Sequence, residues 1–265
     1  MTLLCIGVFA SSLTCSLVLT PYVRHVCKSH SWLVAPDADR HLHNTPLPRL
    51  GGIAIFAAFL VGNTFILLNA WLHSQSSFEI SSKAPFTILF AGSMIFLLGF
   101  YDDLYRVGAY SKFAVQALAA VILFWGGIQV RNLPVLFGHH QLPWFISLAF
   151  GILWVLAITN AFNLIDGVDG LAAGSALSSS VILFIAALLN QNASVSLMTL
   201  ALSGAILGFL RYNFNPATIF LGDSGSLFIG FMLSALALEG AQKARPIVAV
   251  AIPVSPPLRR AVLTP

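Results

Sequence analysis

The stretch that decides the fold runs from residue 142 to residue 161 and reads LPWFISLAFGILWVLAITNA. It contains no Asp, Glu, Lys or Arg, and its length of about 20 residues is that of a helix that crosses a lipid bilayer. Runs of the same kind recur along the whole chain. They show no alternation of period two, and only helices or closed barrels satisfy the backbone in lipid, so we predict helices.

The composition of the whole chain agrees with this interpretation. Of its 265 residues 58% are hydrophobic and only 8% are charged, which is too apolar for the surface of a soluble domain. We therefore predict an all-α polytopic transmembrane helix bundle of about nine spans, forming a single integral membrane domain over residues 1–265. The predicted spans lie near 2–22, 51–72, 84–101, 112–127, 142–161, 171–189, 194–212, 225–239 and 246–258.

The charged side chains are distributed unevenly between the two sides of this map. The chain has 13 Lys and Arg residues and a formal net charge of +4, but no basic stripe with interleaved aromatics, so a nucleic-acid partner is not expected. Nine of the 13 cations fall in the loops on one side, which places that side in the cytoplasm and the N-terminus outside.

The carboxylates gather on the same predicted cytoplasmic side. Seven of the nine acidic residues lie there: Asp37, Asp39, Asp102, Asp103, Asp166, Asp169 and Asp223. Acidic residues are not what the orientation rule sorts, so this clustering needs another cause. A cation-binding site is the natural candidate.

The first two polar segments are PDADRHLHNTPLPRLGG, residues 36–52, and GFYDDLYRVGAYSKFAVQ, residues 99–116. In the first, Arg40, His43 and Arg49 are candidates to hold phosphates, with a solvated basic connector as the alternative. In the second, the adjacent Asp102 and Asp103 repel each other unless a positive charge lies between them. Two solvated loop acids remain the alternative for that pair.

The third segment, NAFNLIDGVDGLAAG, covers residues 160–174. It spaces Asn160, Asn163, Asp166 and Asp169 three apart, so neighbouring members share a side of any helical turn. Polar groups in an apolar stretch at a membrane edge are costly when buried unpaired, which favours a binding site over filler. A structural hydrogen-bond network is the alternative.

The fourth segment, YNFNPATIFLGDSGSLFIG, covers residues 212–230. It sets Asp223 among glycines just before an apolar helix, where backbone N–H groups can face an anion while the carboxylate holds a metal. GDSG also surrounds the nucleophile of trypsin-like serine proteases, but that chemistry needs a soluble β-barrel, so Ser224 is not expected to be catalytic. Ser224 and Ser226 are better interpreted as polar caps or phosphate contacts.

Taken in this order, the four segments resemble those of the polyprenyl-phosphate N-acetylhexosamine-1-phosphate transferases (glycosyltransferase family 4). The first loop and the form NAFNLIDGVDGL are most similar to the bacterial undecaprenyl-phosphate N-acetylglucosamine-1-phosphate transferase branch, and less so to the muramoyl-pentapeptide branch. The resemblance implies that the phosphate oxygen of undecaprenyl phosphate attacks the β-phosphorus of a UDP-N-acetylhexosamine. The products are a polyprenyl-diphosphate sugar and UMP, in the first membrane step of cell-envelope polysaccharide synthesis.

The resemblance also implies a cofactor, site residues and a location. Mg²⁺, with Mn²⁺ as an alternative, suits a site made of one or two carboxylates and substrate phosphates. Catalysis is assigned to Asp102 and Asp103, metal binding to Asp223 and Asp166, and substrate binding to Lys112, Asn163, Asp166 and Asp169. The expected location is the bacterial inner membrane, with the lipid bilayer as partner and the active site facing the cytoplasm. A homodimer stays open.

The chain departs from the family pattern at its C-terminal end. Members of the family usually continue into a His-rich cytoplasmic loop and a further helix, whereas this chain ends with ARPIVAVAIPVSPPLRRAVLTP. We therefore expect it to lack that loop and the last helix. Two other hypotheses remain: a truncated, inactive relative, and a transporter, whose site would lie near the bilayer midplane rather than at helix ends.

Overall fold

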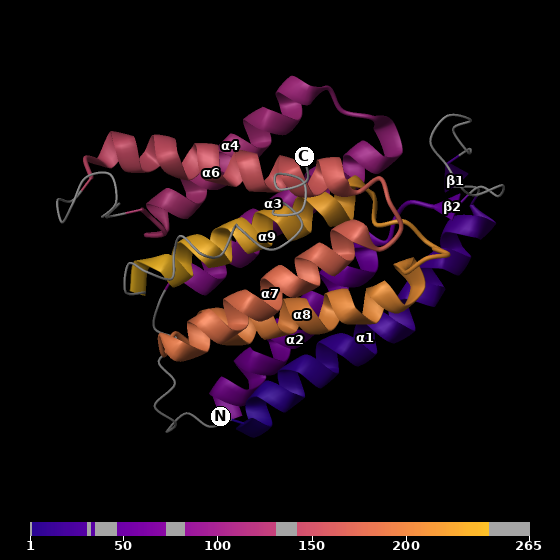
Figure 1. Cartoon of the computed structure of the whole chain (residues 1–265), viewed down its shortest axis with the longest axis horizontal. Coiled ribbons are helices and arrows are strands. Elements are labelled where there is room, and N and C mark those ends of the chain that lie inside the picture. The colour runs from indigo at the N-terminus through magenta and orange to yellow at the C-terminus, as the bar shows by residue number, and fades with distance from the viewer. Residues whose placement is uncertain (1, 31–32, 35–46, 73–82, 131–141, 244–265) are drawn as a thin grey trace, which may run out of the picture.

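The computed structural model describes residues 2–30, 33–34, 47–72, 83–130 and 142–243. Within them the chain forms eight helices and one two-stranded sheet (Figure 1). The helices are α1 (Thr2–Ser29), α2 (Gly52–Leu72), α3 (Ala84–Tyr105), α4 (Ala109–Trp125), α6 (Trp144–Ile165), α7 (Leu171–Leu189), α8 (Ala193–Asn213) and α9 (Gly222–Lys243). The strands β1 (Leu33–Val34) and β2 (Leu47–Pro48) pair in antiparallel fashion.

The prediction of an all-α polytopic bundle is confirmed. Seven of the described helices are long and apolar enough to cross a membrane, and α4 is a shorter apolar helix. Eight of the predicted spans each fall on one of these helices. The ninth, near 246–258, lies outside the described residues.

The first helix is longer than the sequence predicted, because it continues through Pro21 to Ser29. Proline has no N–H to donate to the carbonyl four residues earlier, and an unpaired carbonyl is costly in a lipid environment. Here the hydroxyl of Tyr212 donates to that carbonyl, the one of Leu17, at 3.0 Å. A side chain of α8 thus replaces the missing backbone hydrogen bond.

Helix α9 is the central element of the bundle. It packs against α2, α3, α6, α7 and α8. Of the residues in its most apolar stretch, 89% are buried inside the protein, compared with 17% for α1 and for α6. Its first turn carries Asp223. The central position of α9 therefore brings this carboxylate into reach of side chains from several other helices.

Close backbone packing surrounds the beginning of α9. The N–H of Phe220 donates to Pro48 O at 2.8 Å, and the N–H groups of Gly51 and Gly52 donate to Phe220 O and Leu221 O at 3.0 and 2.9 Å. Gly222 has φ +76°, and a Cβ placed there would collide with the carbonyl oxygen of Arg49. Glycine is required here both by the left-handed backbone and by the close approach.

The polar segments meet at one end of the bundle. In Figure 1 the sheet, the connection from α6 to α7 and the segment leading into α9 all lie toward the right-hand end. Asp102 and Asp103 lie in the last turn of α3, and Asp223 lies in the first turn of α9. These acids therefore sit at helix ends, which is the placement expected of an enzyme site in this bundle rather than of a midplane transport site.

Candidate active site

One lysine joins two acidic residues from different helices at the centre of the site. The ammonium of Lys112, in the first turn of α4, lies 2.5 Å from Asp102 Oδ2 and 2.6 Å from Asp223 Oδ2. The side chains are 20%, 9% and 17% exposed for Lys112, Asp102 and Asp223. Sequence analysis expected a positive charge between the adjacent Asp102 and Asp103. In the structure Lys112 lies instead between Asp102 and Asp223, and Asp103 faces the backbone of α9.

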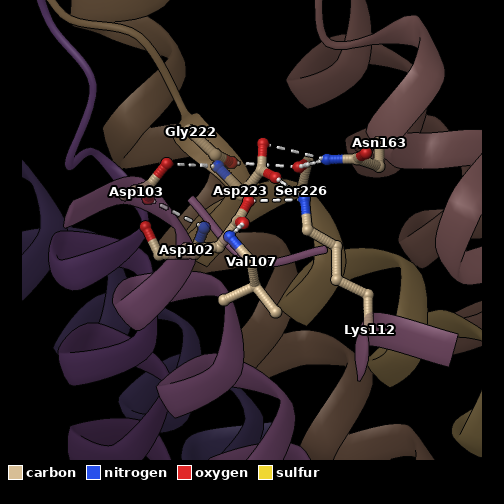
Figure 2. Close-up of polar contacts among 9 residues, drawn as sticks. Asp102, Asp103, Val107, Lys112, Asn163, Gly222, Asp223 and Ser226 are labelled. Carbon is tan, nitrogen blue, oxygen red and sulfur yellow. Dashed lines mark hydrogen bonds and ion pairs between the residues drawn. The ribbon is translucent and has the colours of Figure 1, made fainter. Parts of the chain in front are cut away.

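A second helix, α6, reaches the other oxygen of the Asp223 carboxylate (Figure 2). Asn163, in the last turn of α6, donates from Nδ2 to Asp223 Oδ1 at 3.2 Å and to Ser226 Oγ at 2.9 Å. Ser226 in turn donates to the carbonyl of Gly222 at 2.9 Å. Both oxygens of Asp223 are thus held by side chains. The hydroxyl of Ser226 bonds within its own helix and to Asn163, so the cap or phosphate-contact role expected for it stays a prediction.

Asp103 occupies a different position from its neighbour Asp102. Its two carboxylate oxygens accept the N–H groups of Asp223 and Ser224, at 2.8 and 2.9 Å. These are among the backbone donors that the beginning of a helix leaves unpaired, so Asp103 caps α9 from outside. The catalytic role predicted for Asp103 stays a prediction, and in this structure its carboxylate holds the backbone that carries Asp223.

The turn after α3 directs a backbone donor toward Asp102. Arg106 adopts φ +55°, an uncommon left-handed value for a non-glycine residue, and the N–H of Val107 then donates to Asp102 Oδ1 at 2.5 Å. The carboxylate of Asp102 is therefore fixed by one backbone N–H and one ammonium.

Asp166 follows the last residue of α6 and faces the other charged groups of the site. Burial raises the pKa of Asp166 to about 7; the charge of Arg49 and the N–H of Gly222 oppose this rise, and the carboxylates of Asp223 and Asp103 add to it. The site contains these three carboxylates and that of Asp102, and its cations are Lys112 and Arg49. With all six groups ionised, its formal charge is −2. A surplus of this size favours a divalent cation.

The other predicted residues divide into two groups. Asp169 accepts the N–H of Ala217 at 2.9 Å, so its carboxylate anchors the segment before α9. Arg49 is exposed, and its charge acts on Asp166. Arg40 and His43 lie outside the described residues.

The burial of Ser224 argues against its acting as a nucleophile. Ser224 is fully buried, with 0% of its surface exposed, and its backbone N–H is held by Asp103. The sequence analysis had rejected a protease-like role on the grounds of fold. The burial of Ser224 gives an independent reason, because a buried hydroxyl has no access to a substrate.

The donor set fits a hard divalent cation. Among the described residues no group of three or more His, Cys, Asp or Glu side chains is arranged to hold a metal ion by itself. Mg²⁺ is usually bound by one or two carboxylates, with water and substrate phosphates completing its shell. Asp223 and Asp166, whose carboxylates interact, are two side chains of the kind that such a site needs.

Gln116 was missed by the sequence analysis, and Asn160 was noticed only as part of a spacing. Asn160 Nδ2 donates to Gln116 Oε1 at 2.6 Å, one helical turn deeper in the bundle than the cluster. The only sequence signal was a glutamine four residues after Lys112, on the same helix face. A single glutamine in an apolar helix does not identify its partner.

The fold and the site together define a polytopic membrane protein with an acidic, lysine-bridged centre at one end of the bundle. A family model described as glycosyl transferase family 4 matches residues 85–241, more than half of the chain. This range includes the acidic pair, Lys112, the third polar segment and Asp223. The chain belongs to glycosyl transferase family 4, as its resemblance predicted.

Curated relatives agree with the family assignment. The chain is 33% identical over 248 residues to the probable undecaprenyl-phosphate N-acetylglucosaminyl 1-phosphate transferase of Bacillus subtilis, covering 93% of this chain and 66% of that protein. It is 36% identical over 219 residues to the decaprenyl-phosphate N-acetylglucosaminephosphotransferase of Mycobacterium tuberculosis, covering 78% of this chain and 54% of that protein. It is 33% identical over 211 residues to the phospho-N-acetylmuramoyl-pentapeptide-transferase of Latilactobacillus sakei, covering 75% and 63%.

Two facts follow from these alignments. The chain spans between about half and two thirds of the length of these relatives. The percentage identities to the N-acetylglucosamine and muramoyl-pentapeptide relatives are nearly equal, so they do not separate the two branches.

Proposed function

We propose that this chain carries the transferase site for moving N-acetylglucosamine 1-phosphate from UDP-N-acetylglucosamine to undecaprenyl phosphate, with release of UMP. The observation that carries the proposal is Lys112 held between Asp102 and Asp223. A cation and two carboxylates gathered at one end of the bundle support a site for two anionic substrates. Membership of glycosyl transferase family 4 supports the same reaction class.

The proposed reaction exchanges one diphosphate linkage for another. An oxygen of the lipid phosphate forms a bond to the β-phosphorus of the nucleotide sugar, while the bond from that phosphorus to the bridging oxygen breaks and UMP leaves. Little net bond energy changes, so the protein must contribute mainly by positioning and by neutralising charge.

Each residue of the cluster has a proposed task. Asp223 and Asp166 hold Mg²⁺, which, when bound, supplies positive charge to the diphosphate oxygens. Asp102, fixed by Val107, orients the acceptor phosphate or accepts its remaining proton. Lys112 neutralises phosphate charge once it leaves the carboxylates, and Asp103 keeps the backbone of α9 in place.

The location of the site is also a proposal. The cations of the loops favour an orientation in which this end of the bundle faces the cytoplasm. That side is where a nucleotide sugar is available, and the lipid acceptor reaches the site from the bilayer. We propose the bacterial inner membrane for this reason.

The direct test is transfer in membranes. The chain is expressed, and radiolabelled UDP-N-acetylglucosamine, undecaprenyl phosphate and Mg²⁺ are added, with Asp223→Asn as the inactive control. We expect labelled lipid and UMP in equal amounts from the original chain, and loss of both from the variant. The same assay with UDP-N-acetylmuramoyl-pentapeptide decides between the two branches. Transfer from this donor, and not from UDP-N-acetylglucosamine, would exclude UDP-N-acetylglucosamine as the natural donor.

If the chain shows no transfer activity, one further experiment is needed. The chain is then fused to the His-rich loop and last helix that members of the family usually carry. Activity restored by the fusion would assign the site to this chain and part of the machinery to the added segment. Continued silence, with the fusion protein folded and inserted, would contradict the proposed function.

A further inference from the structure

A buried amide pair lies beneath the active-site cluster. Gln116, in the middle of α4, is 0% exposed. Its Oε1 accepts Asn160 Nδ2 of α6 at 2.6 Å, and the same nitrogen donates to the carbonyl of Leu156 at 2.7 Å. The pair is therefore a direct hydrogen bond between two apolar helices.

Stability alone does not explain this pair. Gln116 Nε2 has no hydrogen-bond partner among the described residues, although the side chain is completely buried. An unpaired amide donor in an apolar setting is unfavourable, and an apolar side chain of similar size would avoid that cost. A different reason is needed for a glutamine at this position.

The reason lies in the helices that the pair connects. Lys112 precedes Gln116 by four residues, and Asn163 follows Asn160 by three, so each lies one turn from the pair on its own helix. Lys112 and Asn163 are the side chains that hold the two oxygens of Asp223. The amide pair thus joins the two helices that converge on one carboxylate.

We propose that Gln116 and Asn160 form a positioning pair, which fixes α4 against α6 so that Lys112 and Asn163 reach Asp223 together. Gln116 touches no substrate, because it is fully buried below the cluster. Its effect on turnover passes through Lys112 and therefore rests on the proposed function. Its effect on the position of Lys112 does not.

Loss of the pair affects turnover more than substrate binding. A displacement of about 1 Å at a reacting group costs up to about 100-fold in rate. For Gln116→Met, which keeps the length of the side chain and removes its amide, we expect kcat to fall about tenfold. The KM for the nucleotide sugar stays within about threefold, because the ground-state contacts to substrate remain.

A second readout needs no activity. Lys112 is protected by two carboxylates, so its reaction with acetic anhydride in the purified, substrate-free protein reports its position, with mass spectrometry to quantify labelling. We expect labelling of Lys112 to rise about fivefold in Gln116→Met, as one ion-pair contact is weakened. The control is Ser203→Ala, which removes a buried hydrogen bond of 2.9 Å from Ser203 on α8 to Ser180 on α7.

Rescue separates positioning from general damage. The swap Gln116→Asn with Asn160→Gln keeps the combined length and the donor–acceptor pair, whereas either single change alters the length. We expect the swap to return kcat and labelling toward the original values and the single changes not to. The kcat and the labelling of each variant are compared with those of Ser203→Ala, under conditions in detergent where the two proteins have equal thermal stability.

The outcomes are distinct. Labelling and kcat in Gln116→Met that match Ser203→Ala, or a swap that rescues neither, would overturn the positioning role. A rise in labelling without any transfer from the original chain would support the positioning role and count against the proposed function. Raised labelling together with a lowered kcat supports both.

Discussion

Lys112 occupies the place between carboxylates that a metal ion also favours, and removing it should therefore tighten metal binding. Its ammonium lies 2.5 and 2.6 Å from Asp102 and Asp223. Any divalent cation that uses Asp223 must compete with these contacts. Lys112→Met removes the competitor and keeps most of the side-chain volume.

The magnitude follows from the exposure of the contacts. Lys112 is 20% exposed, so each ion pair is partly screened and contributes about 1 kcal/mol. Two such contacts correspond to about 2 kcal/mol, or about 30-fold in a dissociation constant. We therefore expect Lys112→Met to bind Mn²⁺, a spectroscopic substitute for Mg²⁺, about 30-fold more tightly than the original protein.

The assay measures free Mn²⁺ by electron paramagnetic resonance in detergent, without substrates. Lys112→Arg keeps the charge and should change the affinity little, and Arg211→Met removes one positive charge from the last turn of α8 as a control for overall charge. Transfer activity of Lys112→Met should fall at least tenfold, since the phosphates lose a cation. An unchanged or weakened Mn²⁺ affinity in Lys112→Met would refute the idea that the lysine and the metal compete.

Three further predictions concern pH and packing. Because burial raises the pKa of Asp166 to about 7, its carboxylate is protonated below that pH, so Mn²⁺ affinity should rise about tenfold per pH unit up to pH 7 and level off above it; a pH-independent affinity between 5.5 and 8 would remove Asp166 from the metal site. Gly222→Ala should lower the free energy of unfolding by about 2–4 kcal/mol, since the φ of this residue is +76° and a Cβ there would collide with the backbone. As a control, the Cβ of Gly151→Ala would meet nothing within 4 Å, so this change should be neutral or slightly stabilising in a melting assay. Tyr212→Phe should lower the free energy of unfolding by about 1 kcal/mol, because it leaves the carbonyl of Leu17 unpaired. Pro21→Ala restores the backbone N–H and should abolish that loss, which a double-mutant cycle on thermal unfolding measures. An equal effect of Tyr212→Phe with Pro21 and with Ala at position 21 would contradict this explanation.

The helices were predictable because each depends on its own segment. An apolar run such as 171–189 has few alternatives in lipid, and the helix there begins and ends at the predicted residues. The main error was the end of the first span, predicted near residue 22, where the charges after Pro21 resembled a loop. The helix continues because Tyr212, which lies 195 positions away from Leu17, supplies a donor to it.

The candidate site was predictable as a set of residues and less so as a set of roles. Conspicuous polar groups in apolar sequence identified Asp102, Lys112, Asn163 and Asp223, and the structure brings these four together. Adjacent residues with the same side chain turned out to differ, since Asp102 faces the lysine and Asp103 faces the backbone of α9. Neighbours in a helix point about 100° apart, and what each meets depends on other helices.

The sequence by itself determined that this chain is a bundle of membrane helices and predicted most of its acids on one side, because hydrophobic length and polar cost are local properties. Only the tertiary structure decided that Lys112 bridges two acids, that Asp103 caps α9, and that Gln116 pairs with Asn160. Apart from the contact of Lys112 with Asp102, these contacts join residues separated by 44 to 121 positions in the chain. Such pairings depend on how the helices pack around α9, and no local pattern specifies that packing.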